Sequence, residues 1–89
     1  MRFEWDQRKA AANLRKHGVS FDEAKTVFKD FDVRLIRDEA HSNGEDRFFA
    51  IGFSQRGRLL FVCHCYRRSE TIRLISARKA TPAETKFYR

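Results

Sequence analysis

The stretch that decides the fold runs Ile72-Arg73-Leu74-Ile75-Ser76-Ala77-Arg78. Its apolar residues predict a buried strand, but two arginines interrupt them. Regular alternation would place Arg73, Ile75 and Ala77 on one face of that strand, and Ile72, Leu74, Ser76 and Arg78 on the other. An arginine between core residues is costly unless its guanidinium reaches water, a carboxylate or a bound anion. The stretch therefore indicates either an anion site or a partly exposed strand with solvated or paired arginines.

The chain that precedes this strand predicts a short strand and two helices. Residues 2–5 alternate as a strand does, and Asp6 is the expected N-cap of a helix that runs to about His17. Gly18 is the expected stop, because glycine tolerates the left-handed backbone that ends helices. Residues 20–23 form a capping-box pattern, so a second helix is expected to begin there and to turn phenylalanine, alanine and valine side chains toward the core.

The second half of the chain predicts strands and a short final helix. The expected strands are residues 33–37, 45–53, 58–66 and 70–77, with turns at 54–57 and 67–69. Residues 81–84 form another capping box, with Pro82 at the first helical position. Residues 1–89 are therefore expected to form one α+β domain. It combines a short N-terminal strand, two helices, an antiparallel sheet of about three to four strands covered on one face by helices, and a short C-terminal helix.

The composition of the chain indicates what kind of partner it binds, but it does not indicate an activity. The chain has 89 residues and a formal net charge of +7, so a polyanion is the leading partner: RNA, DNA, an acidic membrane surface or an acidic protein. A soluble protein that is merely basic is the alternative. No apolar run approaches the roughly 20 residues of a membrane span, and the N-terminus lacks the apolar region of a secretion signal.

The two cysteines predict a structural role. Cys63 and Cys65 flank His64, so in a strand the thiols point one way and the imidazole the other, and the three cannot share a metal ion. A disulfide between positions i and i+2 of one strand has poor geometry. We expect two reduced thiols acting as small core residues, and no metal site.

Short blocks along nearly the whole chain point to a known family. They are Phe3-Glu4-Trp5-Asp6, Lys9, Asn13, Lys16-His17-Gly18-Val19, Phe21, Glu45-Asp46-Arg47-Phe48, Arg58-Leu59-Leu60, the stretch from Ile72 to Arg78, Ala80, Glu84 and Tyr88. In this order and spacing they resemble the BrnT family of bacterial type II toxins. After Tyr88 we expect a departure from the family pattern, without any longer C-terminal helix that relatives have.

The resemblance implies a fold related to RelE-type ribonucleases and an RNA-cleaving toxin that arrests translation. It implies a BrnA-like antitoxin, encoded beside the toxin, whose DNA-binding part gives the complex its contact with DNA. A cytoplasmic protein that needs no cofactor and binds no membrane is expected. A non-catalytic basic module that binds an acidic protein partner or RNA in operon regulation is the alternative.

The residues offer the chemistry of metal-independent RNA cleavage, which needs a base for the 2′-hydroxyl, cations for the phosphorane and an acid for the 5′-oxygen. Arginines are suited to clamp phosphate, and histidine, lysine and glutamate can supply charge or move protons. The expected catalytic residues are Lys16, His17, Glu45, Arg47, Arg73 and Arg78, and the expected RNA contacts are Lys9, Asn13, Arg58 and Tyr88. Each also has a structural reading, as a helix cap, a solvated face, a surface ion pair or a packing residue, and the general base stays open among them.

Overall fold

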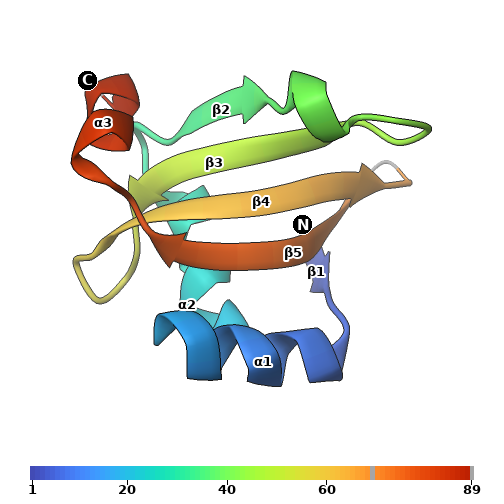
Figure 1. The fold of residues 1–89 in the computed structure, drawn as a ribbon, viewed down its shortest axis with the longest axis horizontal. Coiled ribbons are helices and arrows are strands. Elements are labelled where there is room, and N and C mark those ends of the chain that lie inside the picture. Colours follow the sequence, from blue (N-terminus) through green and yellow to red (C-terminus); the bar gives the residue numbers. More distant parts are fainter. Residues whose placement is uncertain (69, 89) are drawn as a thin grey trace.

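The computed structural model describes residues 1–68 and 70–88 and is built around a five-stranded sheet (Figure 1). The strands are β1 (Arg2–Glu4), β2 (Arg34–Arg37), β3 (Arg47–Phe53), β4 (Leu59–Arg67) and β5 (Thr71–Lys79), in the spatial order β1-β5-β4-β3-β2. Strands β2 to β5 form the expected antiparallel part. Strand β1 pairs with β5 in parallel, so the expectation of three to four antiparallel strands is corrected to five strands of mixed direction. Three alternating residues carry no signal of the direction in which they pair.

The first helix confirms its sequence signals. Helix α1 (Gln7–His17) begins after Asp6, whose carboxylate accepts hydrogen bonds from the backbone N–H groups of Arg8 and Lys9. It ends at Gly18, which has a φ of 69° and donates its N–H to the Leu14 carbonyl at 2.9 Å. A residue with a Cβ would be strained in that left-handed conformation.

The second helix is short, and only half of its predicted capping box is present. Helix α2 (Phe21–Ala24) passes at once into the 3-10 helix η1 (Lys25–Lys29). Ser20 accepts a hydrogen bond from the Glu23 N–H at 3.0 Å, but the Glu23 carboxylate turns away and binds Ser54 and Arg58. Half of the predicted capping box is therefore present, and the other half is replaced by a tertiary ion pair.

The helices cover one face of the sheet and leave the other partly open. Their buried residues join those of the strands in a core formed by Val19, Phe21, Ala24, Val27, Ala50, Leu60, Val62, Ile72, Leu74 and Ala77. Figure 1 shows α1 and α2 below and behind the sheet, while its near face is bordered by two short elements. These are η2 (Glu39–His41) and α3 (Pro82–Thr85), which η3 (Lys86–Tyr88) continues. The capping box of α3 between Thr81 and Glu84 is confirmed in both of its hydrogen bonds.

A β-bulge in β5 overturns the predicted arrangement of the Ile72–Arg78 stretch. Cys63 pairs with Ser76 and His64 pairs with Leu74, so Ile75 is an extra residue without a partner in β4. The alternation shifts by one at that point, because a bulge inserts one residue on one strand only. Arg73 and Arg78 pair with Cys65 and Phe61, two residues that face the same way on β4. Both arginines therefore lie on the open face, and Ala77 faces the helices.

The centre of β4 is buried on both faces. Cys63 and Cys65 are buried free thiols, and burial raises the pKa of each. His64 is fully buried between Phe28 and Phe48, and burial lowers the pKa of this imidazole to about 4. The turn predicted at residues 67–69 includes Ser69, which lies outside the described residues. Among residues 1–68 and 70–88, none of the helices has the length and apolar character that a membrane span requires.

Candidate active site

A pocket of about 460 Å³ opens on the face of the sheet that the helices leave uncovered. Its floor crosses three strands, from Phe49 on β3 to Phe61 on β4 and Ser76 on β5. The Phe49 and Phe61 rings pack with centroids 4.3 Å apart, so the floor is apolar and aromatic. Asp38, which precedes η2, and His41, its last residue, form one wall, and Glu84 of α3 belongs to the other. Polar and charged groups thus surround an apolar floor, as in many ligand sites.

Arg78 is held over this floor by contacts on two sides. Its guanidinium carbon lies 4.5 Å from the centroid of the Phe61 ring. Two nitrogens of the same group donate to the two carboxylate oxygens of Glu84, both at 2.8 Å. This paired guanidinium raises the pKa of Arg78 and holds the pKa of the Glu84 carboxyl below its usual value. A bidentate pair fixes the plane of an arginine, so Arg78 is positioned before any ligand arrives.

Arg47 contributes the second guanidinium from the start of β3. Its side chain lines the pocket, and its charge opposes the effect of burial on the pKa of Cys63. The ion pairs found among residues 1–68 and 70–88 do not include Arg47. In the described part of the chain, this half-buried arginine is thus available to an anionic ligand.

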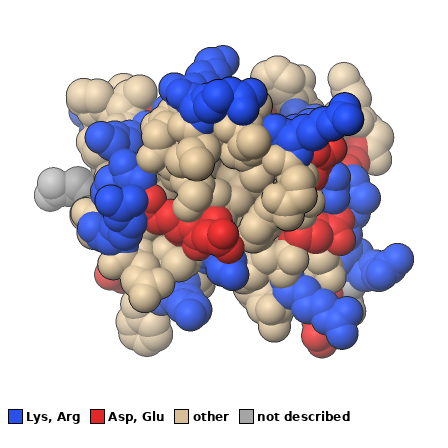
Figure 2. Space-filling view, turned by 90° about the horizontal axis from the view of Figure 1, so that it is seen from below, with Lys and Arg blue, Asp and Glu red and all other residues tan. Residues whose placement is uncertain are grey.

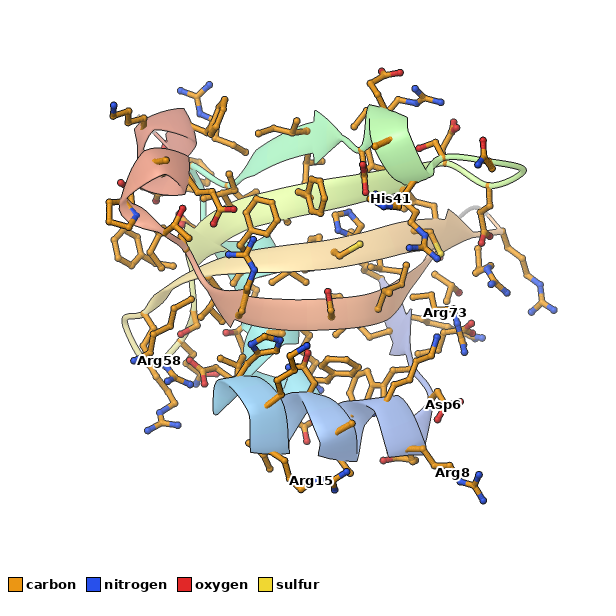
Figure 3. All side chains as sticks on the ribbon, viewed as in Figure 1. Asp6, Arg8, Arg15, His41, Arg58 and Arg73 are labelled. Atoms are coloured by element: carbon orange, nitrogen blue, oxygen red, sulfur yellow. The ribbon has the colours of Figure 1, made fainter. Side chains whose placement is uncertain are left out.

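The wall opposite α3 carries a histidine–carboxylate pair that sequence reasoning missed. His41 Nδ1 lies 3.0 Å from an oxygen of Asp38, whose side chain is only 8% exposed, whereas the His41 ring is largely exposed. With its proton on Nδ1, His41 donates to this carboxylate and leaves Nε2 free to accept a proton. Figure 3 shows His41, the last residue of η2, at the border of the open face. The available signal was the i, i+3 spacing of an acidic residue and a histidine within a polar loop.

The loop that carries this pair is fixed to the strand that carries Arg47. The Ser42 hydroxyl donates to the Asp38 carbonyl at 2.6 Å and accepts from the Arg47 N–H at 3.1 Å. The Asp38 N–H in turn donates to the Arg47 carbonyl at 2.7 Å. One small hydrogen-bonded unit therefore positions Asp38, His41 and Arg47 together.

A second, smaller pocket lies between α1 and β5. It has a volume of about 230 Å³, and Lys9, Lys16 and His17 line it. Ile75 and Ser76 line both pockets, so the bulged part of β5 separates the two. With Asn13, which also lines it, the structure thus brings four predicted residues of α1 next to the pocket that holds Arg47 and Arg78.

Three other predicted residues have partners away from both pockets. Arg73 donates to Glu4 of the neighbouring β1 at 2.9 Å. Glu45 pairs with Arg67 at 2.8 Å on the surface. Arg58 binds the nearly buried Glu23 and the Gly18 carbonyl, and its hydrogen bonds lower the pKa of Glu23. Figure 3 shows Arg58 and Arg73 at opposite sides of the molecule.

Two further predicted residues have roles within the fold. The Asn13 amide donates to the Ala77 carbonyl at 2.8 Å and accepts from the Ala77 N–H at 3.0 Å, so it pairs with the edge of β5 as a strand would. The Tyr88 hydroxyl donates to Asp30 at 2.6 Å, and this hydrogen bond raises the pKa of Tyr88 to about 12. The structure accordingly uses the polar atoms of Asn13 and Tyr88 to hold the fold.

The face of the molecule on the α1 side carries charged side chains of both signs. Figure 2 shows the face on the α1 side, where Lys and Arg gather around the margin and Asp and Glu lie toward the middle. Among the described residues, no group of three or more His, Cys, Asp or Glu side chains is arranged to hold a metal ion.

The comparisons with known proteins agree with this architecture. Residues 5–84 match the family model described as the ribonuclease toxin BrnT of type II toxin–antitoxin systems. The chain is similar to the 1.1 Å crystal structure of the Brucella abortus ribonuclease toxin BrnT, at 25% sequence identity and a TM-score of 0.71. That similarity covers 91% of this chain and 97% of the Brucella chain. The comparison with curated proteins found no match. Because the family match spans most of its length, the chain belongs to the BrnT family of ribonuclease toxins of type II toxin–antitoxin systems.

Proposed function

We propose that this chain cleaves RNA at the pocket on the open face of the sheet, using the 2′-hydroxyl of the RNA as the nucleophile. The observation that carries the proposal is the meeting of Arg47, Arg78 and the Asp38–His41 pair around one aromatic floor. These groups provide what phosphodiester transfer requires, which is stabilisation of negative charge and a site that accepts a proton.

In the proposed first half of the reaction, His41 is the general base. Its Nε2 takes the proton of the 2′-hydroxyl while Asp38 holds Nδ1 and stabilises the imidazolium that forms. The 2′-oxygen attacks the adjacent phosphorus, and the charge that develops on the equatorial oxygens is met by Arg47 and Arg78. Because Glu84 already fixes Arg78, little reorganisation is needed as this charge develops.

In the second half, the bond between phosphorus and the 5′-oxygen breaks and that oxygen takes up a proton. We assign this proton to His17 in the adjoining pocket, because imidazole both accepts and donates protons near neutral pH. Lys9 and Lys16 contact the flanking phosphates. The products are a 2′,3′-cyclic phosphate and a 5′-hydroxyl, and the donor set supplies each of these steps without a metal ion.

The cellular role that fits this chemistry is that of a toxin acting on RNA in the cytoplasm. We propose that the fold is related to RelE-type ribonucleases, that cleavage arrests translation, and that a BrnA-like antitoxin neutralises the toxin. Contact with DNA would then occur only through the antitoxin.

The proposal is tested with purified protein and a labelled RNA in EDTA. Cleavage should persist and leave a cyclic phosphate, and one 2′-deoxy substitution immediately 5′ of the mapped cut should abolish it there. Binding should change little, because several phosphate contacts dominate affinity for RNA. Cleavage of the deoxy substrate at the same bond would show that water or a protein group is the nucleophile. Binding without cleavage would favour the non-catalytic basic module.

A further inference from the structure

Strand β2 gives the sheet an edge that ends beside the candidate active site. Among residues 1–68 and 70–88, no strand pairs with the side of β2 that faces away from β3. A free edge offers a row of backbone donors and acceptors to an added strand, which is how many proteins bind an extended peptide. The 3-10 helix η2, with Asp38 and His41, follows β2 in sequence and forms a wall of the pocket.

The register identifies which backbone groups of β2 point outward. The Asp38 N–H donates to the Arg47 carbonyl at 2.7 Å, in line with the pairing of Arg37 and Phe48 one step before. Hydrogen-bonded pairs alternate along an antiparallel ladder, so Ile36 also bonds to β3. The N–H and C=O groups of Leu35 and Arg37 therefore point to the free edge.

Exposed apolar side chains lie along this edge and at the end where β2 begins. Leu35 is 51% exposed, Phe31 is fully exposed, and Phe53 is 45% exposed. The Phe31 and Phe53 region is held together by Asp30, which accepts from the Phe53 N–H at 2.7 Å and from the Tyr88 hydroxyl. Apolar groups gathered beside an unpaired edge are typical of an interaction surface.

A hollow completes this surface. It has a volume of about 640 Å³ and is lined by Asp32, Arg34, Leu59, Thr85 and Tyr88, so it lies between the start of β2 and the C-terminal helices. A strand added along β2 would direct alternate side chains toward the open face of the sheet, and the one next to Arg34 would reach this hollow. An anchoring side chain thus has a place that is already formed.

We propose that the free edge of β2 is the docking site of the antitoxin, which adds an extended, acidic segment as a sixth strand and inserts an apolar side chain into the hollow. The occupant follows from the family, since a type II toxin has an antitoxin partner, and from the net charge of +7, which favours an acidic one. The inference rests on the neutralising partner of the proposed function and not on the route of RNA cleavage. Docking there places the partner at the rim of the pocket, next to His41.

The first test compares two equally exposed leucines at different places in the fold. Leu35 and Leu14 are both 51% exposed, but Leu35 lies on the free edge strand β2 and Leu14 lies on α1. The probe is the protein encoded by the adjacent small reading frame, titrated against Leu35→Asp and Leu14→Asp in an Arg47→Ala background that avoids toxicity. Leu35→Asp should weaken the complex at least about tenfold, and Leu14→Asp should leave it unchanged. Loss of binding only in Leu14→Asp, or no complex with the unsubstituted chain, overturns the proposal.

The second test measures the backbone directly. Amide hydrogen exchange should show that Leu35 and Arg37 exchange rapidly in the free toxin and become protected in the complex, whereas Ile36 and Asp38 are protected in both. Leu35→Pro removes an outward N–H without touching the ladder to β3, so it should weaken binding while thermal unfolding stays close to that of the parent chain. Unchanged exchange at both outward amides overturns strand addition. A failure of RNA cleavage leaves both tests intact, so the two proposals fail separately.

Discussion

Two arginines with opposite surroundings give a sharp test of the proposed active site. Arg47→Ala and Arg58→Ala each remove one positive charge from a chain of formal charge +7, so both lower general attraction for RNA equally. Arg47 lines the pocket and belongs to none of the ion pairs found in the described residues. Arg58 instead neutralises Glu23. We expect one variant to lose catalysis and the other to lose stability.

The expected magnitudes follow from these contacts. Loss of a group that stabilises transition-state charge typically lowers the rate about 10²–10³-fold, or about 2.7–4 kcal/mol of barrier, and this is the expectation for Arg47→Ala. In Arg58→Ala the Glu23 carboxylate, whose side chain is 4% exposed, keeps only the Ser54 hydroxyl at 2.7 Å and Arg56 at 3.7 Å. Leaving a nearly buried carboxylate so poorly paired costs roughly 2 kcal/mol, less than for an isolated buried charge.

The assay measures cleavage and unfolding on the same protein preparations. For a domain of this size, roughly 2 kcal/mol corresponds to a melting temperature lower by about 10 °C. Single-turnover cleavage of end-labelled RNA is measured at a temperature well below both melting points. Equal losses of cleavage in the two variants would mean that charge alone matters, and full activity in Arg47→Ala would refute the assignment of Arg47.

Three further predictions concern the groups around the pocket and the core. Arg78→Ala should lower single-turnover cleavage by about 10²-fold, whereas Arg73→Ala, which disturbs only a pair at the β1 edge, should stay within about threefold of the parent rate. Asp38→Asn should lower the cleavage rate without changing RNA binding, because His41 loses the charged partner that holds its Nδ1; an unchanged cleavage rate would remove the pair from the mechanism. The buried His64 has a pKa of about 4, below its unfolded value, so the unfolded chain binds more protons between about pH 6.5 and 4 and stability should fall as pH drops through that window. A His64→Phe variant should show a flatter fall in chemical denaturation, and an equal slope would refute the assignment.

Local chemistry made the helices and turns predictable. Asp6, Gly18, Ser20 and Thr81 cap their helices as expected, because a cap depends on one side chain and the few amides beside it. The position of β3 was also predictable, since Arg47–Phe53 lies within the strand expected at residues 45–53. The α+β class follows from these local signals alone.

Pairings between distant residues were not predictable in the same way. The bulge at Ile75 depends on how β5 fits against β4, and neither glycine nor proline marks it. Regular alternation therefore put Arg73 and Arg78 on opposite faces. The sequence equally gave no sign that Asn13 pairs with Ala77, 64 residues away, or that β1 is parallel to its neighbour.

In the candidate site, too, local chemistry was predictable and contacts between distant residues were not. Arginines, lysines and histidines were visible in the sequence as suitable groups, but their partners decide which are available. Arg58 and Arg73 pair with carboxylates away from the pocket, and Arg78 pairs with Glu84 at the pocket itself. Arg47 lines the pocket and enters no ion pair among the described residues. His41 becomes a candidate catalytic residue only because the nearly buried Asp38 pairs with its ring. Side-chain chemistry can be read from a chain, but availability is a property of the packed structure.

The bulge in β5 also predicts how the gene tolerates the loss of a codon. Since Ile75 has no partner in β4, deleting it would leave Leu74 opposite His64 and Ser76 opposite Cys63, in an unbroken ladder. Arg78 would keep its place opposite Phe61. A codon removed at almost any other point of the strand would turn every later side chain to the wrong face. Ile75 is thus a residue of β5 that the ladder does not need, and it lies between the two pockets. Losing its codon should change the shape of the site while the fold persists.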